Sequence, residues 1–175
     1  LHGLPWYAVS IGLEIKGRLE IGVVYDPGRN ELFVAERGKG ARLNDRRLRV
    51  SAQTRLPGAV VGTGFPFKSH QHLDAYTETF KAVSRAGCAV RRAGSAALDL
   101  AYVAAGRFDG FWELGLQAWD IAAGVLLIRE AGGVVTDIRG GDQIMKTGNV
   151  VGGTLRVHQA LLDTIKPHLG ADLPA

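Results

Sequence analysis

Residues 110–137, GFWELGLQAWDIAAGVLLIREAGGVVTD, decide how the rest of the sequence is interpreted. Two carboxylates, Glu113 and Asp120, bracket a short loop, and a strongly apolar segment follows Asp120 up to Gly132-Gly133. An apolar segment that lacks a polar face is typical of a buried helix. A glycine that supplies a left-handed residue ends such a helix, and Val134-Val135 then begins a strand. The stretch therefore predicts a strand, a loop with two acids, a buried helix and a further strand.

Two roles fit Asp120 at the start of this helix. A carboxylate in the first turn accepts hydrogen bonds from free backbone N–H groups and lies at the positive end of the helix dipole. Spacing alone favours this capping role by roughly two to one. The other role is a metal or substrate ligand at the edge of a sheet, where a helix N-terminus also favours phosphate. Spacing does not decide between them.

The composition is that of a globular protein. The 175 residues are 46% hydrophobic and 22% charged, so we expect residues 1–175 to form a single domain with a real core. No apolar run reaches the roughly 18 to 20 residues of a membrane span, and the first residues do not resemble a signal peptide. Cys88 is the only cysteine, which fits a reducing compartment. We therefore expect a cytoplasmic protein without membrane contact.

A short basic stretch carries much of the net charge of +4. A basic patch can meet nucleic acid, an acidic protein or a phosphorylated substrate. A solvated loop is favoured instead, because no aromatic residues are interleaved with the charges. The basic residues are Arg37, Lys39, Arg42, Arg46, Arg47 and Arg49.

Alternating apolar residues and turn signals predict an antiparallel meander in the first part of the chain, followed by alternating helices and strands. This order predicts a layered α/β or α+β sandwich. Turns are expected at Lys16-Gly17, Asp26-Pro27-Gly28 and Asn44-Asp45. The predicted strands are 4–15, 18–25, 31–36, 41–43, 59–63, 89–91, 107–113, 134–135 and 149–151, and the further predicted helices are 70–85, 96–105 and 156–169.

Several polar or glycine-rich positions lie at the ends of these elements. Ser95 and Thr154 are predicted helix caps, and the Gly-Ser before residue 96 is also a ready anion site. Thr63 lies between two glycines after a strand, where the backbone can approach a ligand closely or simply turn. His70 and His72 have no carboxylate or cysteine at metal-ligand spacing, so we expect them at the surface.

Three segments after Glu113 resemble the second sequence signature of the inositol monophosphatase family: Trp119-Asp120, Ala122-Ala123-Gly124 and Glu130-Ala131-Gly132-Gly133. Residues 37–41, 62–66 and 92–102 are similar to further blocks of the family, and of its bacterial branch in particular. The resemblance covers nearly the whole chain. It implies an α+β fold, a layered αβαβα sandwich of the sugar-phosphatase type, and it favours the ligand role of Asp120.

This resemblance implies that the protein hydrolyses inositol monophosphate, a small phosphorylated polyol, to inositol and phosphate, with Mg²⁺ as cofactor. The resemblance makes Asp120 a catalytic metal ligand that also touches a ring hydroxyl, and Glu113 a contact of an inositol hydroxyl. Gly94, Ser95 and Ala96 match the segment that lines the sugar site through backbone groups. Thr63 and Gly64 lie near the substrate by analogy. A homodimer is implied in the same way.

The sequence departs from the family in one respect. It has no Asp-Pro-x-Asp-Gly motif, which carries two of the family's metal-binding carboxylates, and Asp26-Pro27 is followed by Gly-Arg. Because Mg²⁺ requires several hard oxygen ligands, Asp120 and Glu113 are too few to hold it. We therefore expect the C-terminal two-thirds of such a fold, N-terminally truncated, with the remaining ligands upstream. The 175 residues alone are expected to be inactive.

Two other functions stay open at this point. One is a non-catalytic binding protein of the transcription or RNA machinery, which the basic stretch and the missing motif favour. The bacterial branch includes an enterobacterial member that binds the transcription machinery during ribosomal RNA antitermination. The other is a related bisphosphate or nucleotide phosphatase, acting on fructose bisphosphate or a 3′-phosphoadenosine nucleotide.

Overall fold

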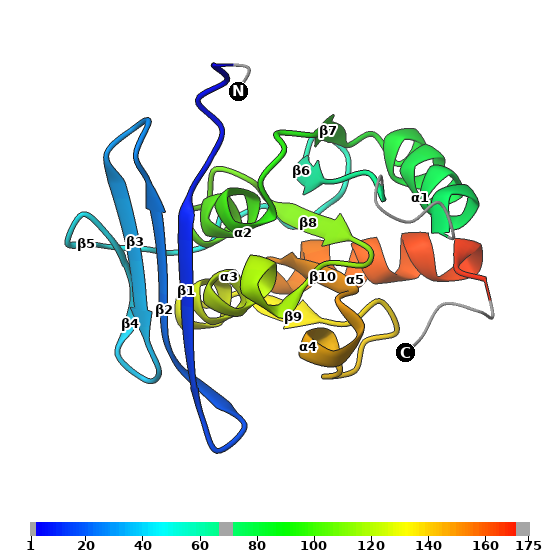
Figure 1. Ribbon diagram of the computed structural model, residues 1–175. Helices are drawn as coiled ribbons and strands as arrows, with labels where there is room; N and C mark the ends of the chain where they lie inside the picture. The colour runs from blue at the N-terminus through cyan, green and yellow to red at the C-terminus, as the bar shows by residue number, and fades with distance from the viewer. Residues whose placement is uncertain (1–2, 67–71, 171–175) are drawn as a thin grey trace.

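Two five-stranded sheets form the framework of the protein (Figure 1). The computed structural model describes residues 3–66 and 72–170. In the first sheet every neighbouring pair of strands is antiparallel, in the order β1-β2-β3-β4-β5. This is the predicted meander. Its strands are β1 (Val9–Ile15), β2 (Arg18–Asp26), β3 (Glu31–Glu36), β4 (Gly40–Leu43) and β5 (Arg46–Arg47).

The tight turns of the meander follow from residues that tolerate a positive φ angle. Lys16 and Gly17 have φ angles of 51° and 75°, and Asn44 and Asp45 have 44° and 66°. Two successive residues of this kind make the hairpin turn whose twist matches that of the flanking strands. The predicted turns are therefore confirmed, although β1 begins at Val9 and not at residue 4.

The second sheet is mixed and has the order β7-β6-β8-β10-β9. β6 runs parallel to β7 and β8, whereas β10 is antiparallel to β8 and β9. Thr63 is paired with Trp112, so the ends of β6 and β8 meet at one edge and the segments after them lie side by side. The strands are β6 (Val60–Thr63), β7 (Ala89–Arg91), β8 (Gly110–Glu113), β9 (Val134–Thr136) and β10 (Val150–Gly153).

Helices α2 (Ala96–Ala104) and α3 (Ala118–Glu130) lie between the two sheets, while α1 (Leu73–Arg85) and α5 (Leu155–Ile165) lie on the other side of the second sheet (Figure 1). The result is a layered α+β sandwich, as predicted. In the part of the chain that the structure describes, no helix covers the outer face of the first sheet, so four of the five expected layers are present. The remaining helices are α4 (Ile144–Thr147) and the 3₁₀ helix η2 (Lys166–His168).

The central helix α3 is buried on most of its circumference, as its apolar sequence predicts. Ile121, Leu127 and Ile128 have no exposed surface, and burying each side chain of this size contributes about 1.5–3 kcal/mol. Gly124 allows α2 to approach, because a Cβ atom at this position would overlap the side chain of Leu100. Gly132, with a φ angle of 87°, supplies the left-handed residue that ends the helix.

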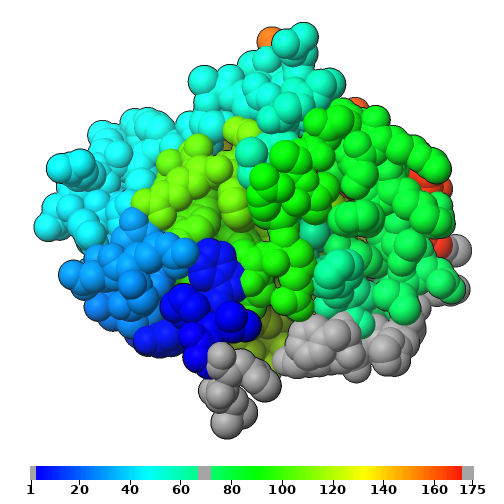
Figure 2. Space-filling view, turned by 90° about the horizontal axis from the view of Figure 1, so that it is seen from above, coloured from blue at the N-terminus to red at the C-terminus, as the bar shows by residue number. Residues whose placement is uncertain are grey.

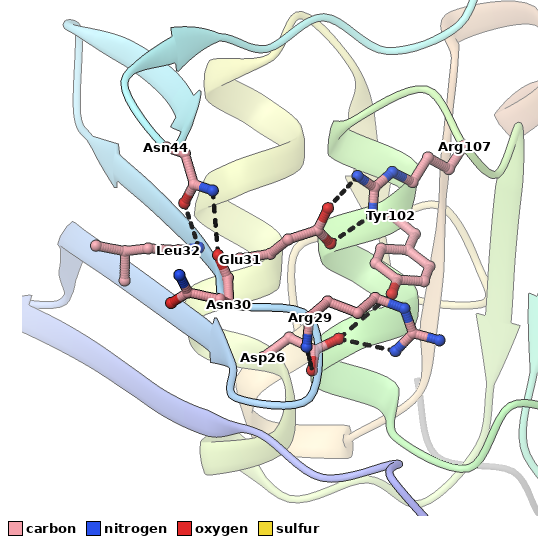
Figure 3. Close-up of polar contacts among 8 residues, drawn as sticks. All are labelled: Asp26, Arg29, Asn30, Glu31, Leu32, Asn44, Tyr102 and Arg107. Atoms are coloured by element: carbon pink, nitrogen blue, oxygen red, sulfur yellow. Dashed lines mark hydrogen bonds and ion pairs between the residues drawn. The ribbon is translucent and has the colours of Figure 1, made fainter.

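A polar cluster ties the turn after β2 to α2 (Figure 3). The fully buried carboxylate of Asp26 accepts hydrogen bonds from the backbone N–H of Arg29 at 3.2 Å, from its guanidinium at 3.0 Å and from the Tyr102 hydroxyl at 3.5 Å. Arg107 makes two hydrogen bonds to Glu31, at 2.6 and 2.5 Å. Asp26 of the single Asp-Pro pair therefore has a structural role.

Several element boundaries differ from their prediction. The helix after β8 begins at Ala118, two residues before Asp120, and α5 ends at Ile165. α1 begins at Leu73, and the predicted helix start at His70 lies outside the described residues. The caps are confirmed, since the hydroxyls of Ser95 and Thr154 each accept a hydrogen bond from the first turn of their helix. Within residues 3–66 and 72–170, none of the helices has the length and apolar character needed to cross a bilayer.

Candidate functional site

A cavity of about 570 Å³ opens where the segment before β1, the end of β6, the start of α2 and the loop between β8 and α3 meet. The space-filling view shows the N-terminal segment, in blue, against green segments of the chain (Figure 2). Four stretches that are distant in sequence therefore contribute to one site. All the residues singled out by resemblance line this cavity: Thr63, Gly64, Gly94, Ser95, Ala96, Glu113 and Asp120.

Asp120 lies in the first turn of α3 and faces the cavity. Its Oδ2 atom accepts a hydrogen bond from the backbone N–H of Gln117 at 3.0 Å, which satisfies one of the unpaired donors at the helix start. Asp120 is thus a capping residue and a cavity residue at once. The two roles that the sequence left open are compatible in this geometry.

The start of α2 forms a second wall of the cavity. Ser95 has an extended backbone and its hydroxyl accepts a hydrogen bond from the N–H of Leu98 at 3.4 Å. Gly94 has a φ angle of 109°, and a Cβ atom there would lie 3.3 Å from Cδ1 of Trp6. This glycine lets the turn before the helix pack against the N-terminal segment. The positive end of α2 consequently opens on the cavity, where it favours an anion.

Glu113 ends β8, and its carboxylate lies directly against the backbone of Gly64, where a Cβ atom would overlap it. Burial raises the pKa of Glu113 to about 8. The negative charges of Asp99 and Asp120 act in the same direction, and the guanidinium of Arg92 opposes them. A carboxyl in this environment holds its proton near neutral pH.

Asp99, on α2, is the third acidic residue that lines this cavity, after Glu113 and Asp120. It is 1% exposed, and its Oδ1 atom has no hydrogen-bond partner among the described residues. Burial raises its pKa to about 7, against the opposing charge of Arg92. Perturbed carboxyls that share a cavity are typical of functional sites.

The sequence match to known proteins fits this arrangement. Residues 1–169 match the profile of the inositol monophosphatase family. The chain belongs to the inositol monophosphatase family. The sandwich of two sheets and the cavity at the edge of β6 and β8 are therefore the framework of a family member.

Similar proteins carry two kinds of name. The chain is 53% identical over 175 residues to the Nus factor SuhB of Pseudomonas aeruginosa, which covers 99% of this chain and 65% of that protein. It is 52% identical over 171 residues to an inositol-1-monophosphatase of Mesorhizobium japonicum, covering 98% of this chain and 64% of that protein. It is also 48% identical to the crystal structure of the extragenic suppressor protein suhB from Bartonella henselae, with a TM-score of 0.91 over 96% of this chain and 64% of that one. The chain thus spans less than two-thirds of the length of these relatives.

The resemblance to the inositol monophosphatase family assigned roles to seven of the cavity residues, but it gave none to the buried acid Asp99. Asp99 stands in the apolar sequence AALDLAYVA, one turn after Ser95. A single acid among small apolar residues on a buried helix is the signal that could have found it, because such a residue is rarely buried without a reason.

The described residues do not form a complete metal site. Within residues 3–66 and 72–170, no group of three His, Cys, Asp or Glu side chains could hold a metal ion. Asp120 offers a hard carboxylate of the kind that Mg²⁺ binds, but only one. Its role as a metal ligand stays a prediction.

Two further predictions concern residues near the site. His72 is half-buried at the cavity wall rather than free at the surface, and His70 lies outside the described residues. The basic residues are all exposed to solvent, as predicted, but they extend over strands β4 and β5 and the adjoining segments and not over a single loop. The turn before β4 is held by α3, since the carboxylate of Glu130 accepts hydrogen bonds from the N–H groups of Gly38 and Gly40, both at 2.8 Å.

Proposed function

We propose that the full-length protein is a phosphoric monoester hydrolase that converts inositol monophosphate to inositol and phosphate in a Mg²⁺-dependent reaction. The observation that carries this proposal is the cavity, where carboxyls from α2, β8 and α3 converge beside the start of α2 in an inositol monophosphatase family member. The name of the Mesorhizobium relative, an inositol-1-monophosphatase, supports the substrate. A cytoplasmic homodimer is proposed on family grounds alone.

Different cavity residues would contact the sugar ring and the phosphate of the substrate. The backbone of Gly94, Ser95 and Ala96 lines the sugar site, and the Glu113 carboxyl binds a ring hydroxyl. Asp120 lies beside the phosphate, where a water oxygen bonds to phosphorus, the ester P–O bond breaks and the leaving oxygen takes a proton. Because the described residues do not complete a metal site, we derive no step through the metal, and we propose that its other ligands lie outside these residues.

Phosphate release from myo-inositol 1-phosphate by the full-length protein tests this function. We expect release in the presence of Mg²⁺, its loss in excess chelator, and a fall in kcat of roughly 100-fold or more in Asp120→Asn, the order found when a charge-stabilising group is removed. The matched control is Asp142→Asn, which removes an exposed carboxylate at the far end of α3 and should leave the rate unchanged. A full-length protein that is inactive, or indifferent to Asp120→Asn, contradicts the proposal.

A second function is favoured by a different observation. The Pseudomonas relative is named a Nus factor, and the edge of the first sheet presents Arg42, Arg46 and Arg47 to solvent. We propose that this edge contacts the transcription machinery or its RNA. Co-purification of the full-length protein with RNA polymerase or ribosomal RNA leader should be lost in Arg46→Gln/Arg47→Gln while phosphate release persists. No association at physiological salt would count against this role.

A further inference from the structure

The loop of residues 114–117 joins two acids of the cavity, Glu113 at the end of β8 and Asp120 in the first turn of α3. Residues 114–116 line the cavity themselves. On the β8 side, Glu113 is paired with Val150 of β10. The relative position of the two carboxyls therefore depends on how this loop is held.

Two successive backbone N–H groups of the loop donate to the turn of residues 148–149, which precedes β10. The N–H of Gly115 donates to Oδ1 of Asn149 at 3.0 Å. The N–H of Leu116 donates to the carbonyl oxygen of Gly148 at 2.9 Å. A turn that is distant in sequence thus holds the loop at two consecutive residues.

This turn is itself fixed by buried structure. Asn149 is 1% exposed, and its backbone N–H donates to the hydroxyl oxygen of Thr147 at 3.2 Å. The N–H of Gly148 donates to the carbonyl oxygen of Ile144 at 2.9 Å, which closes the short helix α4. The side chain of Ile144 is buried in the core between the two sheets. The acceptors of the loop are therefore attached to the core.

The contact between the turn and the loop requires a glycine at position 148. Gly148 has a φ angle of 68°, and a Cβ atom there would overlap the carbonyl oxygen of Leu116. Gly132, which ends α3, offers a direct comparison. Its φ angle is 87°, but an added Cβ atom would have no other atom within 4 Å. Both glycines have a left-handed backbone, and of the two Gly148 alone touches the loop.

We propose that Gly148 and Asn149 are positioning residues that fix the loop of residues 114–117 and thereby set the relative positions of Glu113 and Asp120. In this arrangement α4 is the support of the turn. A displacement of about 1 Å at a reacting group can lower a rate roughly 100-fold, so a loop between two site residues needs such a support. The inference rests on the proposed function for the reaction that is measured, whereas the contacts do not depend on it.

Steady-state kinetics of the full-length protein on myo-inositol 1-phosphate with Mg²⁺ compare the two glycines. In Gly148→Ala the added methyl group displaces the Leu116 carbonyl, so we expect kcat/KM to fall roughly 100-fold. Gly132→Ala introduces similar backbone strain without touching the loop, and its kcat/KM should stay within about threefold of wild type. Equal losses in the two variants, or wild-type kinetics in Gly148→Ala, would overturn the proposal.

Two variants of Asn149 decide the question even if Gly148→Ala fails to fold. Asn149→Leu keeps the volume but removes the acceptor of the Gly115 N–H, so kcat/KM should fall roughly tenfold. Asn149→Asp keeps an acceptor oxygen and should stay within about threefold of wild type. Because a buried carboxylate costs more than a buried leucine, stability alone would rank the two variants in the opposite order. An Asn149→Asp variant as slow as Asn149→Leu, or an Asn149→Leu variant as fast as wild type, would overturn the proposal.

Amide hydrogen exchange followed by NMR tests the contacts without any activity. In the wild-type full-length protein the N–H of Gly115 should be protected although this residue is exposed. In Asn149→Leu this protection should be lost while that of the Leu116 N–H remains. Absent protection in the wild type would overturn the inference. A protein that shows the expected exchange but releases no phosphate would instead overturn the proposed function and keep the support of the loop.

Discussion

Two buried acids of this protein, Asp137 after β9 and Asp99 on α2, have opposite surroundings. Asp137 is 2% exposed, and its carboxylate accepts hydrogen bonds from the backbone N–H groups of Arg139, Gly141 and Gln143 at 2.8, 2.9 and 3.1 Å. Burial acts to raise its pKa, but these donors outweigh burial and hold the pKa below the usual range. Asp99 is equally buried, has an oxygen without a donor, and has a raised pKa.

The difference shows that burial alone does not identify a functional acid. A carboxylate surrounded by N–H groups is saturated, and Asp137 therefore fixes the loop of residues 137–143. A carboxyl that lacks donors and borders a cavity keeps bonding capacity for a neighbour or a ligand. The number of donors separates the structural acid from the candidate functional one.

The largest expected effect is the loss of the saturated acid. Asp137→Ala leaves three backbone N–H groups without their acceptor, so we expect the free energy of unfolding to fall by about 3 kcal/mol. Asp99→Asn should cost less than about 1 kcal/mol, because it removes a poorly satisfied charge. Urea denaturation of the full-length protein measures both, and equal costs would remove the distinction.

The pH dependence of stability should have opposite signs for the two acids. Folding raises the pKa values of Asp99 and Glu113, so their contribution is present at low pH and is lost as pH rises through about 7 and 8. Folding lowers the pKa of Asp137, whose contribution is lost only as pH falls. We expect the free energy of unfolding to decrease by several kcal/mol between pH 5 and 9, and by less in Glu113→Gln. Parallel curves for the two proteins would refute this assignment.

A smaller effect is expected when a methyl group is added at Gly64, against the Glu113 carboxylate. The Cβ atom of Gly64→Ala would overlap the Glu113 carboxylate, whose flexible side chain can swing away. We expect KM for myo-inositol 1-phosphate to rise roughly tenfold with a change in melting temperature of a few degrees. Gly170→Ala, at a position with open space, is the control and should be neutral. A larger loss of stability than of affinity would make Gly64 a packing residue only.

The smallest effect belongs to an exposed acid. Asp142 is 81% exposed and pairs with Arg129 at 2.7 Å. Solvent screens such a pair, so Asp142→Asn should change the free energy of unfolding by less than about 0.5 kcal/mol in chemical denaturation. A change near that of Asp137→Ala would mean that hydrogen-bond saturation is not what distinguishes these acids.

Local sequence signals predicted much of this fold. Lys16-Gly17 and Asn44-Asp45 identify their turns because few residues tolerate a positive φ angle, and the continuous apolar segment after Asp120 identifies a buried helix. The four-residue helix α4 was missed because it is too short for periodicity. Asp120 lies in the first turn of α3, as predicted, but the sequence did not identify Gln117 as the N-cap because glutamine has no strong capping preference.

The candidate site was predicted through resemblance, which located residues on four separate segments. Asp99 was not, because its apolar neighbours in sequence indicate a buried helix but do not show that its side chain borders the cavity. The sequence also could not show that Asp120 both caps a helix and faces the cavity. Both features arise from tertiary packing.

A crystal structure of the full-length protein with myo-inositol 1-phosphate tests the central claim most directly. We predict the ligand in the cavity of about 570 Å³, with a ring hydroxyl on Glu113 and the phosphate beside Asp120. A ligand bound instead in the groove lined by Arg18, Arg37 and Arg129, with the cavity empty, would contradict the account.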